Sequence, residues 1–164
     1  MLKNIPCFCE FSDNSMKLFS FLSNKLPVDT QRIEQAISHL EQQTSAELRV
    51  VVERKAKGKA DAMARANQLF DELKMRETAE RNGVLIYLSF KPHNLAIVGD
   101  QAIHEKVGQV FWQSVYDAMK LQCQQADYTK ALCQGIKQVE VQLATYFPRQ
   151  HDDMNELSNE VVIK

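Results

Sequence analysis

The sequence of 164 residues has few of the signals that identify common functions. Its formal net charge is −1, from 20 basic and 21 acidic residues, so it has no general attraction to polyanions and no specific nucleic-acid partner is expected. Its five glycines form neither GxxxxGK nor GxGxxG, the usual phosphate-binding loops. No Ser lies in a GxSxG motif, and no Cys or His pair has zinc-site spacing. The common catalytic motifs are therefore excluded.

Long hydrophobic runs are also missing. No segment approaches the roughly 20 apolar residues of a membrane-spanning helix. The apolar segment 16–22 is short, and polar residues interrupt the chain before it, so neither a signal peptide nor an anchor is expected. Cys7 and Cys9 form no CxxC, and we interpret them as packing residues, with a metal or redox pair as the alternative. Free thiols suit a reducing compartment, which predicts a cytoplasmic protein.

The composition that is present, 45% hydrophobic and 25% charged, is typical of a globular domain. We expect an N-terminal extension over residues 1–26, an α/β domain over residues 27–148 and a polar tail over residues 149–164. Hydrophobic periodicity predicts the elements of the domain. The predicted helices cover residues 31–43, 60–74, 103–119 and 128–143, and the predicted strands cover residues 46–53, 84–88 and 95–98.

The order of these elements predicts the architecture. Residues 84–88 are apolar at every position, which is typical of a strand at the centre of a sheet. The strand–helix–strand unit before them predicts a parallel crossover, and the hairpin after them adds an antiparallel strand. The fold class is therefore α/β, a helix–sheet–helix sandwich around a small mixed β-sheet.

This topology brings polar residues to one edge of the sheet. Parallel strands begin at Glu47 and after Asn82, and the antiparallel strand ends at Asp100. Thr44 and Ser45 precede the first strand, so carboxylate, amide and hydroxyl oxygens gather at one edge. These are ligands for a hard cation such as Ca²⁺ or Mg²⁺. With two carboxylates the expected dissociation constant is on the order of 10⁻⁴–10⁻³ M.

The same residues have a structural interpretation. Glu47 pairs with Arg49 or Arg81 in this alternative, and Asn82 shapes the turn before its strand. Asp100 caps the helix that follows it. Ion pairs and caps produce clusters that look like ligand sites.

The opposite edge carries a basic loop with Arg54, Lys55, Lys57 and Lys59. A phosphate could bind at the helix start near residues 58–60, because free backbone N–H groups favour anions there. The favoured interpretation is a solvated loop. An anion-binding protein is the alternative, and it predicts salt-dependent binding to polyanions.

Three segments of the sequence resemble the strand motifs of the TPM domain family, which includes a thylakoid-lumen acid phosphatase and many bacterial envelope proteins. Phe111-Trp112, Phe147-Pro148 and residues 155–161 are similar to its bacterial branch, and the resemblance runs from about Ile33 to Val162. The three strand segments are residues 44–48 (TSAEL), 81–87 (RNGVLIY) and 96–100 (AIVGD).

The resemblance implies an α/β sandwich, calcium binding in some members and phosphatase activity in the plant branch. Glu47, Asn82 and Asp100 match motif positions, while Ala46 replaces the family's usual glycine. The resemblance provides no nucleophile that we can place in this sequence. Relatives that look like membrane-associated accessory factors imply a protein partner, with a membrane surface as one candidate location.

We therefore expect a non-catalytic binding or accessory module that binds Ca²⁺ or Mg²⁺ through Glu47, Asn82 and Asp100, with no organic cofactor. The alternative is a metal-assisted acid phosphatase that acts on phosphate esters at the same edge.

Overall fold

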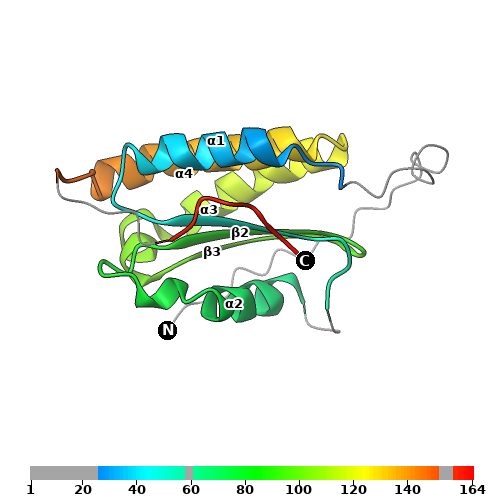
Figure 1. The fold of residues 1–164 in the computed structure, drawn as a ribbon, viewed down its shortest axis with the longest axis horizontal. Helices are drawn as coiled ribbons and strands as arrows, with labels where there is room; N and C mark the ends of the chain where they lie inside the picture. The colour runs from blue at the N-terminus through cyan, green and yellow to red at the C-terminus, as the bar shows by residue number, and fades with distance from the viewer. Residues whose placement is uncertain (1–25, 58–60, 152–156) are drawn as a thin grey trace.

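A computed structural model describes residues 26–57, 61–151 and 157–164. Cys7, Cys9 and the loop residues 58–60 lie outside this part of the chain, and so does the greater part of the predicted N-terminal extension. Figure 1 shows three layers: the sheet lies between α2 on one side and α1, α3 and α4 on the other. The predicted helix–sheet–helix sandwich is confirmed.

The sheet has four strands in the order β3-β2-β1-β4. Their bounds are β1 (Leu48–Glu53), β2 (Val84–Phe90), β3 (His93–Gly99) and β4 (Val162–Ile163). β1 pairs with β2 in parallel, and β2 pairs with β3 in antiparallel. The mixed sheet is therefore as predicted, and β2, which contains the apolar run of residues 84–88, lies between two other strands.

The helices are α1 (Thr30–Glu41), α2 (Ala62–Glu72), α3 (Gln101–Gln124) and α4 (Tyr128–Tyr146), with a 3₁₀ turn η1 (Met75–Glu77) after α2. Each of the four α-helices begins directly after an aspartate whose carboxylate accepts a backbone N–H of the first turn. These N-caps are Asp29, Asp61, Asp100 and Asp127. Capping satisfies a backbone donor that has no partner inside the helix.

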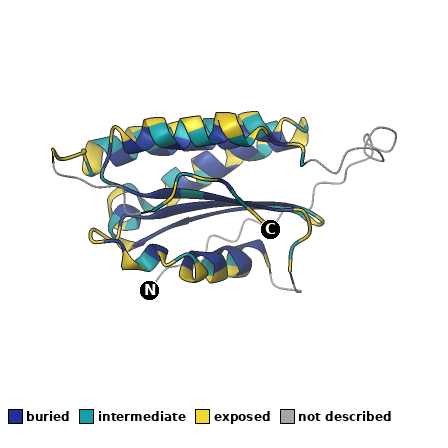
Figure 2. Cartoon of the chain, in the orientation of Figure 1, coloured by how far each residue is buried: buried dark blue, intermediate teal, exposed yellow. Residues whose placement is uncertain are grey.

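Two hydrophobic cores lie on the two faces of the sheet, as the burial pattern in Figure 2 shows. The alternation of β1 divides its side chains between them, because successive residues of a strand point to opposite faces. Leu48, Val50 and Val52 pack in the larger core under α1, α3 and α4, and Val51 packs in the smaller core against α2. Both faces of the sheet are thus covered.

The C-terminal segment differs from the prediction of a polar tail. Val162–Ile163 form β4, a parallel edge strand on β1 that is not among the predicted strands. Backbone hydrogen bonds extend the pairing, from Lys164 N to Val52 O and from Arg54 N to Lys164 O, each 3.0 Å. Two residues are too few to show the alternation of apolar and polar side chains that predicts a strand. Whether they form a strand depends on pairing with β1, which is far away in the sequence. In the part of the chain that is described, no helix has the length and apolarity needed to cross a membrane.

Candidate functional site

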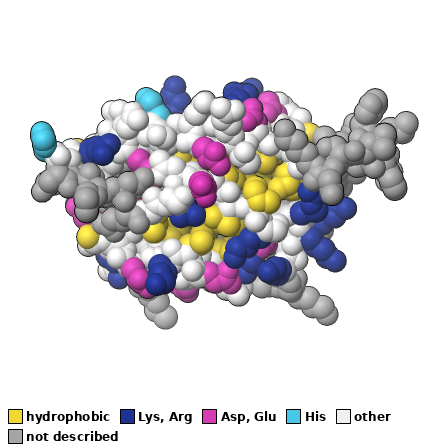
Figure 3. All heavy atoms as spheres, viewed as in Figure 1, with side chains coloured by type: hydrophobic (Ala, Val, Ile, Leu, Met, Phe, Trp, Pro, Cys, Tyr) yellow, Lys and Arg dark blue, Asp and Glu magenta, His cyan; other side chains and the backbone are white. Residues whose placement is uncertain are grey.

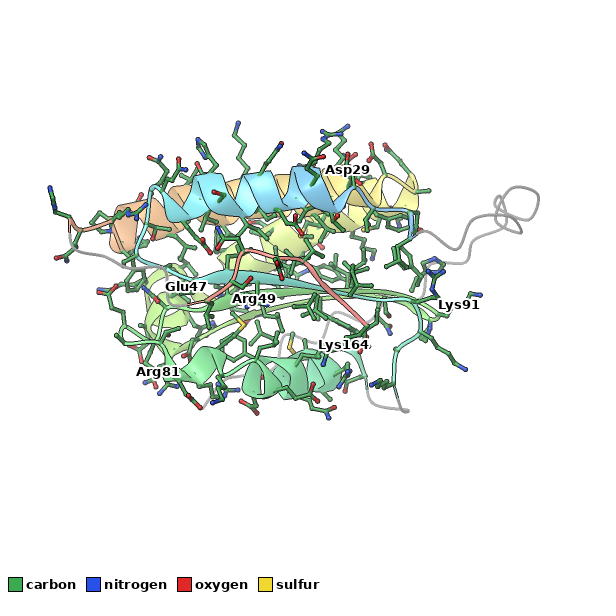
Figure 4. All side chains as sticks on the ribbon, viewed as in Figure 1. Asp29, Glu47, Arg49, Arg81, Lys91 and Lys164 are labelled. Atoms are coloured by element: carbon green, nitrogen blue, oxygen red, sulfur yellow. The ribbon has the colours of Figure 1, made fainter. Side chains whose placement is uncertain are left out.

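The three predicted ligand residues lie at the same edge of the sheet. Glu47 directly precedes β1, and its carbonyl oxygen accepts the N–H of Val84 at 2.8 Å. The N–H of Asp100, directly after β3, donates to the carbonyl oxygen of Gly83 at 2.8 Å. The ends of β1, β2 and β3 are therefore held side by side, and we call this edge the amino-end edge. Figure 4 shows Glu47 and Arg81 at this end of the molecule.

Asn82 takes part in a small polar cluster. Its amide nitrogen donates to Glu80 Oε2 at 3.2 Å and lies 3.5 Å from Ser45 Oγ. The Ser45 hydroxyl in turn donates to the same oxygen of Glu80. A hydroxyl, an amide and a carboxylate from two separate loops thus meet at this edge.

Glu80 is the member of this cluster that sequence reasoning missed. It is an exposed carboxylate two residues before Asn82, and no hydrophobic pattern identifies it. Arg81, between them, has a left-handed backbone with φ of 54°. Such a residue turns the chain sharply, which fits the contact between its two neighbours. The one available signal was the turn-forming pair Asn82-Gly83 immediately after it.

Asp100 is fully buried and has several donors around its carboxylate. Its Oδ1 accepts the N–H of Gln101 at 2.8 Å, so the alternative role as a helix cap is confirmed. Arg81 donates to both oxygens, at 2.7 Å and 3.1 Å, and Arg76 lies 3.7 Å away. The hydrogen bond from Arg81 to Asp100 raises the pKa of Arg81. A cation that used Asp100 would have to displace Arg81, which makes Asp100 a poor ligand.

Glu47 is buried and directly precedes β1, two residues before Arg49. Burial lowers the pKa of Arg49, and the negative charges of Glu41, Glu47 and Glu160 oppose this shift. The charge of Glu47 is thus partly balanced by Arg49, as the structural interpretation expects, while Arg81 pairs with Asp100. Glu47 and Glu80 are both acidic residues of the amino-end edge, besides Asp100.

Thr44 has a structural role. Its hydroxyl donates to the carbonyl oxygen of Phe147 at 2.5 Å and accepts the N–H of Ala46 at 3.1 Å. It also forms an isolated bridge with Pro148, which ties the end of α4 to the start of β1. Thr44 therefore supports the edge and leaves Ser45 as the hydroxyl that contacts the polar cluster.

Within residues 26–57, 61–151 and 157–164, no three His, Cys, Asp or Glu residues are grouped in a way that could hold a metal ion. A cation at the amino-end edge would need amide and hydroxyl oxygens besides carboxylates. The role of Glu47, Asn82 and Asp100 as metal ligands stays a prediction.

Trp112 and Cys123 are core residues, and Cys133 is partly buried against the same core. Trp112 is 1% exposed and packs against Gly99, so it is a core residue. Cys123 and Cys133 are free thiols, and burial raises the pKa of Cys123 to about 12. A thiol with such a pKa is unreactive at neutral pH. Among the described residues, neither cysteine has the surroundings of a nucleophile.

Comparison with known proteins agrees with this architecture. The TPM domain model matches residues 20–142. The NMR structure of the BA42 protein from the psychrophilic bacterium Bizionia argentinensis has a TM-score of 0.78 and 34% sequence identity to this chain, with 87% of this chain and 99% of that chain covered. No curated protein matches the chain. The match over most of the sequence and the similarity to BA42 show that this chain belongs to the TPM domain family.

Proposed function

We propose that this protein is a non-catalytic binding module whose amino-end edge binds a divalent cation, Ca²⁺ or Mg²⁺. The observation that carries the proposal is the contact among Ser45, Glu80 and Asn82. Ser45 lies two residues before Glu47 in the sequence. Hydroxyl, amide and carboxylate oxygens are the ligands that hard cations take, so Asn82, whose amide nitrogen faces Glu80 here, would turn its amide to ligate through Oδ1. Since Asp100 is engaged by Arg81 and by the start of α3, the proposed ligand set is Ser45, Glu47, Glu80 and Asn82.

The charge of this site sets its expected affinity. Glu47 and Glu80 supply two carboxylates, and Arg49 and Arg81 lie close to the same edge. A site with few negative charges and nearby cations binds calcium weakly, on the order of 10⁻⁴–10⁻³ M. Such a site responds to millimolar cation concentrations and leaves the fold intact without metal. A protein partner is the other half of the proposal, and the cation would tune the surface that this partner contacts.

A titration with CaCl₂ and MgCl₂ followed by two-dimensional NMR tests the cation site. We expect amide signals of residues 44–48 and 80–83 to shift at millimolar cation, with those of α4 unchanged. Glu80→Gln removes one carboxylate charge from an exposed position, so it should weaken binding about tenfold without unfolding the protein. Glu77→Gln is the matched control, because Glu77 is also exposed and lies in η1, outside the polar cluster.

Two results of this titration would contradict the proposal. One is the absence of any shift in the signals of residues 44–48 and 80–83 up to several millimolar cation. The other is equal weakening by Glu80→Gln and Glu77→Gln, which would indicate diffuse attraction to the protein's negative charges.

The alternative function is metal-assisted hydrolysis of phosphate esters at the same edge. One specific observation favours it: the Ser45 hydroxyl donates to the Glu80 carboxylate, which places a nucleophile beside a base. If this alternative holds, the wild-type protein hydrolyses p-nitrophenyl phosphate in the presence of the cation. Ser45→Ala then lowers the rate of hydrolysis at least a hundredfold. Activity that survives in Ser45→Ala would indicate a contaminating enzyme. Cation binding without hydrolysis would favour the binding module.

A further inference from the structure

The end of the molecule opposite the amino-end edge carries exposed positive charge. Arg54, Lys55 and Lys57 follow β1, and Lys91 lies in the turn between β2 and β3. The N–H of Ala56 donates to the carbonyl oxygen of Lys91 at 3.0 Å, which holds the two loops together. We call Arg54, Lys55, Lys57 and Lys91 the basic end. Figure 3 shows Lys and Arg side chains gathered at the end where Figure 4 labels Lys91.

Glu53 and Glu72, at the end of β1 and on α2, are engaged by groups outside the basic end. Glu53, the last residue of β1, is fully buried and its oxygens take donors from Arg65 and Tyr87. Glu72 pairs with Lys164 at 2.8 Å and with Arg65 at 3.4 Å. Lys55, Lys57 and Lys91 form no ion pair with any carboxylate in the described ranges. A protein with a net charge of −1 thus has one strongly positive end.

The aromatic side chains at this end are packed against one another. The Phe90 and Tyr128 rings meet edge to face with centroids 4.9 Å apart, and the His93 ring stacks on Tyr128 at 6.3 Å. Proteins that bind single-stranded nucleic acid have open aromatic side chains on which the bases stack. Tyr128 is 5% exposed and its ring is covered by Phe90 and His93, so it offers a base no open face.

An exposed apolar side chain lies beside the positive charge. Ile163 is 48% exposed, and the carbonyl oxygen of the next residue, Lys164, accepts the N–H of Arg54 at 3.0 Å. Pro92, also exposed, stands next to Lys91 at the tip of the β2–β3 hairpin. Basic residues interspersed with single apolar side chains are suited to a bilayer surface, where the charges meet phosphate groups and the apolar groups enter the interface.

We propose that the basic end docks on the surface of an anionic phospholipid bilayer. The contact is formed by two loops that are bonded to each other, so their charges are presented together at one end of the sheet. The docking surface is independent of the amino-end cation site, because the two lie at opposite ends of β1 and β2. Each basic residue near such a surface contributes roughly fivefold in affinity.

Co-sedimentation with vesicles tests the docking surface. Mixed vesicles of phosphatidylcholine and phosphatidylglycerol should retain the wild-type protein, and phosphatidylcholine vesicles should not. EDTA is present throughout, so the result does not depend on a cation bridge. The triple variant Lys55→Gln/Lys57→Gln/Lys91→Gln should bind the mixed vesicles about a hundredfold more weakly. Raising the salt to about 1 M should release the wild type, since the Debye length falls to about 3 Å.

The matched control is Lys74→Gln/Lys106→Gln/Lys137→Gln. It removes the same charge from exposed positions on other elements, and it should change binding less than threefold. Equal loss in both triple variants would overturn the proposal, as would equal retention of the wild type by the two kinds of vesicle. Stronger binding of the wild type to duplex DNA or RNA than to the mixed vesicles would also overturn it. Near-ultraviolet circular dichroism verifies that each variant is folded.

Discussion

Replacement of Arg65 by Met is expected to lower the free energy of unfolding by about 3–5 kcal/mol. Arg65 and Glu53 are 3% and 0% exposed, and they form an ion pair between α2 and β1. Arg65 Nε lies 3.2 Å and 3.3 Å from the two carboxylate oxygens, Nη2 lies 2.5 Å from Oε1, and the Tyr87 hydroxyl donates to Oε2 at 2.8 Å. Met fills a similar volume, but it leaves the Glu53 carboxylate buried without its main donor. Urea unfolding followed by circular dichroism measures the loss.

Two further variants separate the charge from the packing. Glu53→Gln/Arg65→Met removes both charges, so it should recover a large part of the stability that Arg65→Met loses. Arg32→Met is the control for the substitution itself, because Arg32 lies on the exposed face of α1 and should change stability by less than about 0.5 kcal/mol. A double variant as unstable as Arg65→Met would indicate that lost packing, and not the isolated charge, is responsible.

The same pair gives the protein a defined response to acid. Burial acts to raise the pKa of Glu53, but hydrogen bonds from Arg65 and Tyr87 outweigh it and leave the pKa below its ordinary value. The unfolded chain therefore binds a proton at Glu53 at higher pH than the folded protein does. The contribution of Glu53 to stability is present above the unfolded pKa, about 4.3, and is lost as the pH falls through the lower folded value.

Gly99→Ala is expected to lower the free energy of unfolding by about 1–3 kcal/mol. A Cβ atom at Gly99 would overlap Cζ2 of Trp112 and lie 3.0 Å and 3.1 Å from two more atoms of that ring. The indole is rigid and 1% exposed, so it has no free space to enter. Trp112→Phe in the same chain removes part of the obstructing ring and should restore some of the loss. Thermal unfolding of the single and double variants measures this coupling.

Gly135→Ala is the matched control for this prediction. A Cβ atom at Gly135 would meet Met119, whose flexible side chain can move aside, and Ala favours α4 by roughly 1 kcal/mol over Gly. Gly135→Ala should therefore cost less than Gly99→Ala. Equal losses, or no recovery in Gly99→Ala/Trp112→Phe, would contradict a steric limit set by Trp112.

The sequence predicts the parts of this fold that local patterns encode. Residues 84–88 are apolar on both faces, and β2 is a central strand buried on both sides. After Asp100, apolar residues recur at steps of three and four residues, which predicts a helix, and Asp100 caps that helix, α3. Both features depend on residues close together in the chain, where periodicity and capping chemistry are visible.

The parts that the sequence does not predict depend on long-range or conformational detail. Arg65 on α2 pairs with Glu53 on β1. Nothing in the sequence distinguishes these two buried charged residues from charged residues on the surface. Glu80 contacts Asn82 in the polar cluster, and Arg81 between them has a left-handed backbone. A non-glycine residue rarely adopts this conformation, so the sequence does not predict it. Topology predicts that the site residues lie together at the strand ends, but their hydrogen-bond partners depend on side-chain conformations that the sequence does not show.

The length of β2 sets a distance between the two proposed surfaces. Its seven residues rise about 3.3 Å each, so the strand spans roughly 23 Å from the amino-end edge to the basic end. At physiological ionic strength the potential of an anionic bilayer decays over about 8 Å. A molecule docked by its basic end would therefore hold the amino-end edge outside the layer where lipid charge concentrates cations. That edge would sense the cation concentration of the bulk solution, whether the protein is docked or free.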